Sequence, residues 1–222
     1  MRAAIEKDFD LISELPSLKW NHNNYFNSKI INEVPINANH VLEVGCGKGE
    51  LCNLMHHKSK DLTGIDLSNK MIESANTNKS KNNIDFVCGD YLKTDFNSNT
   101  FDFIVSVATV HHIDFKNFIL KSKKELKPGG KLLIIDLYKT PKNKDLLNSV
   151  ISLFYHYLFN LIYNKRLFAT KLEKQYWREH SKLDKFMSFK DINELSKALL
   201  KNAIVKKELF WRYSLLWYKP KH

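Results

Sequence analysis

The sequence predicts an α/β fold with a doubly wound, mostly parallel sheet, and three observations predict it. Short apolar runs alternate with stretches whose apolar residues recur at helical spacing. The first clear apolar run, residues 41–44, leads directly into a loop with glycine at every second position. Acidic residues stand at the ends of the next two runs, at the edge where open parallel sheets bind ligands.

The elements follow one another in a regular order. Apolar residues recur at helical intervals over 25–34 and stop before Pro35, which predicts a helix after a mixed lead-in of residues 1–20. The alternation that follows predicts strands near 40–44, 61–66, 84–88, 101–107 and 131–137. The helices between the strands are expected near 49–57, 68–77 and 114–125.

The alternation ends after Leu137. Residues 146–164 contain no charged side chain but are too polar for a membrane span, so we expect an amphipathic helix packed on the domain. Residues 165–187 are expected to be irregular and basic. Ser188 fits the N-cap of a helix over 189–200, and two final strands are expected near 203–210 and 212–218.

The loop after the first strand is suited to binding a ligand. Its three glycines lack Cβ atoms, so a ligand can lie against the main chain, and the helix after it points its first amides at the same place. The dinucleotide-binding pattern G-x-G-x-x-G has a different spacing. Its third glycine is replaced here by Glu50, whose carboxylate would repel a pyrophosphate.

Glu43 stands two residues before Gly45, and Gly47 and Gly49 follow. This pattern, E-x-G-x-G-x-G, resembles the first motif of the class I S-adenosylmethionine (SAM)-dependent methyltransferases, in particular the small-molecule methyltransferases of types 11 and 12. The bound cofactor would then be SAM, the product S-adenosylhomocysteine, and no metal is expected.

The resemblance continues at later strand ends and is firm over about residues 40–137. The second strand ends in Asp66, and the third is followed by Gly89 and Asp90. Residues 126–135 resemble the family's proline–glycine–glycine turn into its fifth strand. The resemblance implies a Rossmann-like sheet of about seven strands, with the last strand antiparallel beside the fifth.

The family also implies roles for individual residues. Asp66 would bind the two ribose hydroxyls, with Leu67 packed near the adenine. Asp90 would accept a hydrogen bond from the adenine amino group, with Tyr91 as a packing neighbour. The complete set of cofactor-binding residues expected from the resemblance is Tyr25, Glu43, Gly45, Gly47, Gly49, Asp66, Leu67, Met71, Gly89, Asp90, Tyr91 and Val107.

Three histidines are candidate catalytic residues. His111 and His112 directly follow the fourth strand, where one of them could accept a proton from the methyl acceptor and the other could close the cofactor pocket. His22 lies in the polar and aromatic stretch 20–25, which either folds over the cofactor, with Tyr25 at its methionine end, or is a polar helix cap. His180 is interpreted as a surface residue, with a lid position as the alternative.

We expect a single domain in three parts. Residues 1–137 form an N-terminal cap and the SAM-binding core, 138–187 a helical lid, and 188–222 a helix and strand pair that complete the domain. The aromatic side chains of the lid helix, including Phe154 and Tyr157, are expected to line a pocket for a flat or apolar acceptor.

The composition is that of an ordinary globular protein, with 43% hydrophobic and 27% charged residues. The formal net charge of +11 lies entirely in residues 138–222, either as a surface for acidic partners or as a solvated lysine-rich surface. The three cysteines show no metal-binding spacing, and the charged N-terminus lacks a signal peptide. These features suggest a cytoplasmic protein without stable membrane insertion.

The sequence therefore predicts a SAM-dependent methyltransferase that acts on a small molecule, at an O, N, S or C atom that remains open. The stretch 106–109 lacks the N-P-P-Y-type motif of many nucleic-acid methyltransferases. An RNA methyltransferase using the basic C-terminal third, and a non-catalytic SAM-binding partner subunit, remain alternatives. The protein would be a monomer or a homodimer.

Overall fold

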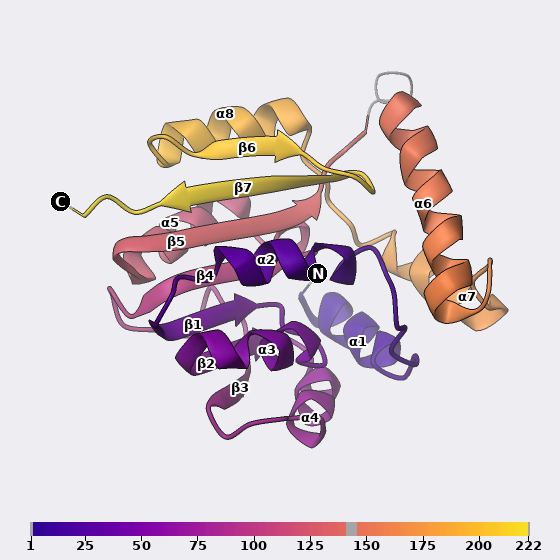
Figure 1. Ribbon diagram of the computed structural model, residues 1–222, viewed down its shortest axis with the longest axis horizontal. Coiled ribbons are helices and arrows are strands. Elements are labelled where there is room, and N and C mark those ends of the chain that lie inside the picture. Colours follow the sequence, from indigo (N-terminus) through magenta and orange to yellow (C-terminus); the bar gives the residue numbers. More distant parts are fainter. Residues whose placement is uncertain (1, 141–145, 222) are drawn as a thin grey trace.

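The computed structural model describes residues 2–140 and 146–221. Its centre is one seven-stranded sheet in the order β3-β2-β1-β4-β5-β7-β6 (Figure 1). The first five strands are parallel, and β7 runs antiparallel between β5 and β6, which confirms the predicted fold class. The strands are β1 (Ala38–Val44), β2 (Ser59–Asp66), β3 (Ile84–Cys88), β4 (Phe101–Val107), β5 (Leu126–Leu137), β6 (Ile204–Lys207) and β7 (Arg212–Tyr218).

Helices cover both faces of the sheet, as expected for a doubly wound fold. The helices α2 (Asn27–Glu33), α3 (Glu50–Met55) and α4 (Asn69–Thr77) bury apolar residues in one core, and α5 (Phe115–Glu125) and α8 (Phe189–Leu199) in the other. The serine and aspartate residues before three of these helices accept a hydrogen bond from the main chain of the first turn, as N-caps do; they are Ser68, Asp114 and Ser188.

The structure corrects three expectations about elements. The lead-in contains a helix, α1 (Arg2–Ile12), and the stretch 165–187 contains another, α7 (Lys171–His180). Thr170 and Glu173 form a reciprocal capping box at the start of α7, a T-x-x-E signal that the sequence does carry. The sixth strand is shorter than expected because Phe210 and Trp211 turn the chain with positive φ angles.

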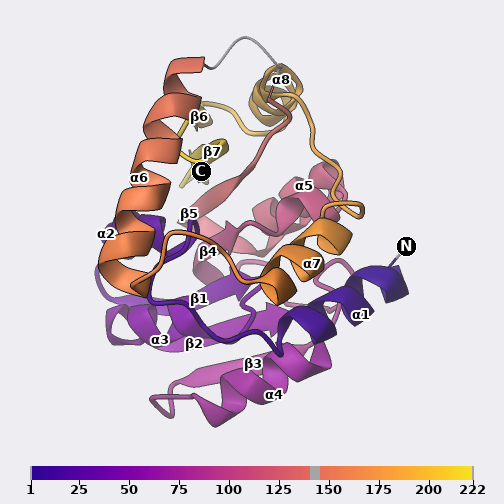
Figure 2. The same ribbon diagram turned by 90° about the vertical axis from the view of Figure 1, so that its right-hand side faces the viewer.

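Three segments lie beyond the carboxyl ends of the parallel strands (Figure 1). They are α6 (Leu146–Asn164), α7 and α1, and α1 and α7 lie side by side (Figure 2). Two hydrogen bonds join Asn164 at the end of α6 to the main chain of Trp20, at 3.1 and 2.8 Å. None of the helices within residues 2–140 and 146–221 is long and apolar enough to cross a lipid bilayer.

One acidic side chain lies inside the core at the end of β1. Glu43 is only 4% exposed, and its Oε2 accepts a hydrogen bond from the Cys52 thiol at 2.9 Å. Burial raises the pKa of Glu43 from 4.5 to about 8, although the Cys52 hydrogen bond lowers it in part. At neutral pH the folded protein therefore holds a proton on Glu43 that the unfolded chain would release.

This buried acid predicts a specific pH dependence of stability in the ligand-free protein. Between pH 4.5 and about 8, unfolding releases the Glu43 proton, so rising pH favours the unfolded chain by up to ~1.4 kcal/mol per pH unit. A Glu43→Gln variant should lose this contribution and gain stability relative to wild type as pH rises. Urea unfolding at several pH values measures the difference, and Glu194→Gln, at an exposed position of α8, is the control and should keep the wild-type slope. Parallel slopes for wild type and Glu43→Gln would contradict the prediction.

Candidate functional site

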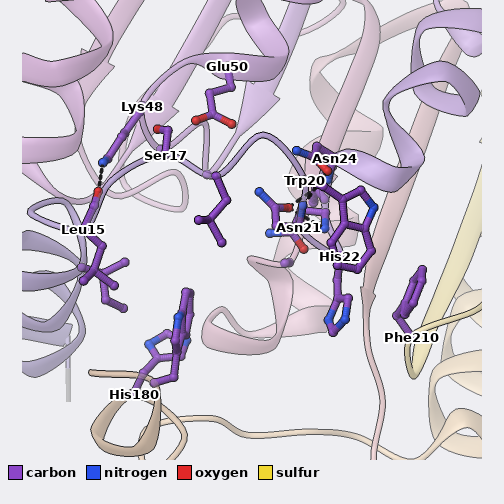
Figure 3. Close-up of a pocket in the computed structure, with 18 of the residues that line it drawn as sticks. Leu15, Ser17, Trp20, Asn21, His22, Asn24, Lys48, Glu50, His180 and Phe210 are labelled. Atoms are coloured by element: carbon purple, nitrogen blue, oxygen red, sulfur yellow. Dashed lines mark hydrogen bonds between the residues drawn. The ribbon is translucent and has the colours of Figure 1, made fainter. Parts of the chain in front are cut away.

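A cavity of about 650 Å³ lies at the carboxyl edge of the sheet, a volume typical of small-molecule sites. Its walls are the glycine loop, the N-terminal segment 9–24, α6, α7, and the first residues of β7. Figure 3 shows His180 at one end of the cavity and His22 with Phe210 at the other. Lys48 of the glycine loop reaches across to the main-chain oxygen of Leu15, at 2.5 Å, and so joins the loop to the N-terminal segment (Figure 3).

The glycine loop is held rigidly, and only one of its glycines faces open space. The amides of Gly45 and Cys46 donate to the Ile65 oxygen of β2 at 2.8 and 3.1 Å. Gly45, Gly47 and Gly49 all have positive φ angles, which favour glycine. A Cβ atom on Gly45 would lie 2.0 Å from Thr109, and one on Gly49 would lie 2.5 Å from the Phe86 ring, whereas one on Gly47 would meet nothing within 4 Å.

Asp66 is fixed directly under this loop. One of its carboxylate oxygens accepts from the Gly47 amide at 2.8 Å and the other from the Ser68 amide at 2.9 Å. Burial raises the pKa of Asp66, and these hydrogen bonds lower it in part. The second strand-end acid, Asp90, forms an ion pair with Arg2 of α1 at 3.1 Å, so α1 extends over the end of β3.

The structure brings only some of the predicted cofactor residues to the cavity. Glu43, Gly45, Gly47, Met71 and Val107 line it. The other predicted cofactor residues are not among its lining residues; they are Tyr25, Gly49, Asp66, Leu67, Gly89, Asp90 and Tyr91.

Two aromatic residues lie clearly elsewhere. Tyr91 is 3% exposed, and its hydroxyl donates to Glu125 of α5 at 2.7 Å, within the core. Tyr25 is 39% exposed and lines a separate depression beside α6.

His22 is a partly buried, uncharged residue of the cavity wall. Its Nε2 lies 3.0 Å from Nδ1 of His156 on α6, and its ring stacks on Phe210 with centroids 4.6 Å apart. Burial, and to a smaller extent the nearby Arg212 and His156, lower the pKa of His22 to about 3. At neutral pH this imidazole is therefore uncharged.

Arg212 is a buried cation at the opposite end of the cavity from His180. Its side chain donates to the Phe210 oxygen at 3.0 Å and to Oδ1 of Asn23. The residue is 5% exposed, and within the described part of the chain its Nε has no hydrogen-bond partner and its guanidinium forms no ion pair. Burial lowers its pKa to about 10, so it stays charged at neutral pH.

The predicted histidine pair lies in a cluster with two residues from the end of α7 and beyond. His111 lines the cavity and His112 does not, and both approach His180 and Asp184. His180 is 8% exposed, which corrects the expectation that it is a surface residue. Burial lowers the pKa of His111, but Asp136 and Asp184 raise it to about 9, whereas burial and His111 lower that of His112 to about 4.

The lid helix α6 presents polar rather than aromatic residues to the cavity. His156 and Asn160 line it, whereas Phe154 and Tyr157 are 63% and 42% exposed and do not. Phe154 and Tyr157 therefore do not line this cavity, whereas Phe159 and Tyr163 of the same helix line the separate depression that includes Tyr25. Several amide side chains from the N-terminal segment line the same end of the cavity; they are Asn21, Asn23, Asn24 and Asn27.

Comparison with known sequences matches this architecture to one family. A methyltransferase domain model matches residues 42–134, from β1 into β5. An uncharacterized methyltransferase of Mycobacterium tuberculosis is 26% identical over 205 residues, which is 90% of this chain and 98% of the relative. Phosphoethanolamine N-methyltransferase 3 of Arabidopsis thaliana is 41% identical over 106 residues, 46% of this chain and 22% of the relative.

Solved structures share the whole fold. A SAM-dependent methyltransferase from Aquifex aeolicus superposes with a TM-score of 0.57 at 18% identity and covers 98% of both chains. A putative methyltransferase from Haloferax volcanii, solved in complex with the Trm112 methyltransferase activator, gives a TM-score of 0.65 at 14% identity and covers 99% of this chain and 97% of its own. Together with the E-x-G-x-G-x-G loop and the sheet order, these matches show that the chain belongs to the class I SAM-dependent methyltransferases.

Proposed function

We propose that this methyltransferase acts on a small molecule that carries a carboxylate or phosphate group. The observation that carries the proposal is Arg212, a buried guanidinium in the cavity wall that forms no ion pair within the described residues. An unpaired buried charge costs free energy, and an anionic ligand in the cavity would remove that cost.

The position of Arg212 favours the acceptor over the cofactor as the source of the anion. Arg212 begins β7, which is three strands away from β1 in the sheet. At about 4.8 Å per strand, roughly 14 Å separates it from the glycine loop. A cofactor held against Gly47 would therefore leave Arg212 for the second substrate. One relative of this chain is, by its name, a methyltransferase of phosphoethanolamine, an anionic small molecule.

The cofactor would lie along the glycine loop. Gly47 leaves its main chain open to a ligand. Asp66 beneath it accepts two hydrogen bonds from backbone amides, and its remaining lone pairs could accept hydrogen bonds from the ribose hydroxyls. Glu43 and Met71 line the same part of the cavity. SAM carries an activated methyl group, so the protein mainly has to align the acceptor with the methyl–sulfur bond and exclude water.

His22 is proposed to orient the acceptor by a hydrogen bond, because a pKa of about 3 makes it a weak base at neutral pH. It is uncharged at neutral pH and lies at the Arg212 end of the cavity, on the segment 9–24 that covers the site. Its partner His156 fixes the ring orientation at 3.0 Å. His111, in contrast, has two carboxylates as neighbours, Asp136 and Asp184.

Products of the reaction test the acceptor class directly. The protein is incubated with methyl-labelled SAM and a cell metabolite extract, and in parallel with an RNA extract. We expect label in small molecules that an anion-exchange resin retains. Label found only in neutral or cationic metabolites would contradict the anionic acceptor, and label in RNA would favour the basic C-terminal third as a nucleic-acid surface.

The open space at Gly47 predicts a substitution that affects ligand binding more than folding. In Gly47→Ala the new methyl group meets no protein atom but occupies the space that a ligand needs. SAM affinity should fall by at least about tenfold, while the positive φ angle costs only about 1–2 kcal/mol of stability. Calorimetry and urea unfolding measure the two effects.

Gly45→Ala is the matched control, because its methyl group would collide with Thr109 and should mainly lower stability. If Gly47→Ala binds SAM like wild type, the cofactor does not lie against this loop.

Removing the buried guanidinium should weaken acceptor binding selectively. Arg212→Met keeps the apolar stem and deletes a charged hydrogen-bond donor, whose loss costs about 1.5–3 kcal/mol. We expect the KM for the anionic acceptor to rise about ten- to a hundredfold, with SAM affinity nearly unchanged. Arg178→Met on the exposed face of α7, with 74% of the side chain exposed, is the control. An unchanged KM in a folded Arg212→Met variant would refute the role.

A further inference from the structure

We propose that His111, His112, His180 and Asp184 bind one divalent transition-metal ion, of the zinc class, in the cavity wall. One ligand atom of each residue lies within 4.8 Å of those of the other three. The four residues come from three places in the chain: η3 (Val110–His112) after β4, the last residue of α7, and the segment after α7. This site is independent of the acceptor proposed above.

The three distances from Asp184 to the imidazoles are close to the edge length of a coordination tetrahedron. Oδ1 of Asp184 lies 3.5 Å from Nε2 of His111, 3.7 Å from Nε2 of His112 and 3.5 Å from Nε2 of His180. These distances are longer than ordinary N–H···O hydrogen bonds. Ligand atoms at Zn–N and Zn–O bond lengths of about 2.0–2.1 Å are separated by about 3.4 Å in a tetrahedron. A single ion would therefore reach all four atoms with small shifts.

The outer hydrogen bonds turn two of the rings toward a metal. Nδ1 of His111 lies 2.7 Å from Oδ1 of Asp136, and Nδ1 of His180 lies 2.6 Å from Oδ2 of Asp8. An ionised carboxylate only accepts hydrogen bonds, so each Nδ1 donates, and a neutral ring then presents the lone pair of its Nε2. Each Nε2 faces Oδ1 of Asp184, and the contact is attractive when a cation lies there, either a proton on the ring or a metal ion shared by the rings. Carboxylate–histidine pairs of this kind support the ligands of many metal sites.

Buried polar atoms of His112 and Asp184 that lack a hydrogen-bond partner also support a metal ion in this cluster. The side chain of His112 is 4% exposed and that of Asp184 10%. Among the described residues, neither ring nitrogen of His112 nor Oδ1 of Asp184 has a hydrogen-bond partner. A proton on one ring would improve only one contact, whereas a metal ion would satisfy one nitrogen on each ring and the Asp184 oxygen together.

The ligand set selects the class of metal. Three imidazoles and one carboxylate suit Zn²⁺ and its transition-metal neighbours, whereas Mg²⁺ and Ca²⁺ prefer oxygen ligands. Four protein ligands form a closed, structural site. The ion would join the end of α7 to η3, and through the Asp8–His180 hydrogen bond also to α1. Its role would be to hold these two covering helices on the core.

Metal content and a cobalt spectrum test the site. Protein without an affinity tag is analysed for bound metals, stripped with a chelator, and reloaded with Zn²⁺ or Co²⁺ alone. We expect about one ion per chain and the intense visible bands of four-coordinate Co²⁺. A protein that neither retains nor rebinds an ion, or that gives only the weak bands of six-coordinate Co²⁺, would overturn the proposal.

Substitutions then assign the ligands. Asp184→Asn and His112→Ala should each weaken Zn²⁺ binding by at least about tenfold in a competition with a chromophoric chelator. His57→Ala, at an exposed histidine of η2 (His56–Lys58), is the matched control and should bind like wild type. Circular dichroism shows whether each variant is folded, and the nearly isosteric Asp184→Asn preserves the test if His112→Ala does not fold. Unchanged affinity in folded Asp184→Asn would refute the assignment.

Hydrogen exchange separates this structural role from incidental binding at surface histidines. Removing the ion should speed amide exchange in α7 and α1 and leave α2 unchanged. Equal protection of α7 with and without the ion would show that the ion does not hold the covering helices.

Discussion

The position of β1 between β2 and β4 is the constraint on which the site depends. Val44, the last residue of β1, pairs with Ile65 on one side and with Ser106 on the other, and Ser106 Oγ donates to the Val44 oxygen at 2.8 Å. The three strands therefore end at one level. The chain must leave β1 between the neighbouring strands β2 and β4. The glycine loop therefore contacts both Asp66, the last residue of β2, and Thr109, which follows β4. Positive φ angles in this loop follow from that confinement.

Residues 40–137 could be predicted closely because their signals are local. Apolar runs bounded by glycine, asparagine or aspartate mark the strands, and Ser68 and Asp114 mark helix starts. The fifth strand begins five residues before the expected 131, because Leu126 already pairs with Phe101 ahead of an irregular register. The helix α1 also carries a local signal, apolar residues at helical spacing (Ile5, Phe9 and Ile12), which the interpretation of residues 1–20 as a mixed lead-in missed. It is stabilised by packing on α4 and α7, which lie far away in the sequence.

The site could be predicted only where its residues follow a local pattern. The glycine loop and the histidines after β4 have positions that a strand-by-strand analysis identifies. Arg212 resembles any arginine at the start of a strand, and its burial depends on the turn at Phe210 and Trp211. His180 and Asp184 are separated from His111 by about seventy residues of sequence, and no spacing rule connects them.

The N-terminal segment, α6 and α7 cover one cavity and are joined by polar and by aromatic contacts. Trp20 bonds to Asn164, His22 to His156, and Asp8 to His180, so each pair couples one covering segment to another. Opening of these contacts would widen the access of a ligand to the cavity. The covering helices are thus suited to be the least stable part of the fold, while the sheet beneath them stays fixed.

Three buried polar groups in the same region give ligands a direct influence on stability. Glu43 holds a proton in the core, Arg212 has no anionic partner in the described residues, and His112 has no hydrogen bond there. Burying such groups without partners opposes folding. A ligand that pairs with one of these groups binds the folded chain and not the unfolded one. Its contribution to the free energy of unfolding then grows with the logarithm of the ligand concentration divided by Kd.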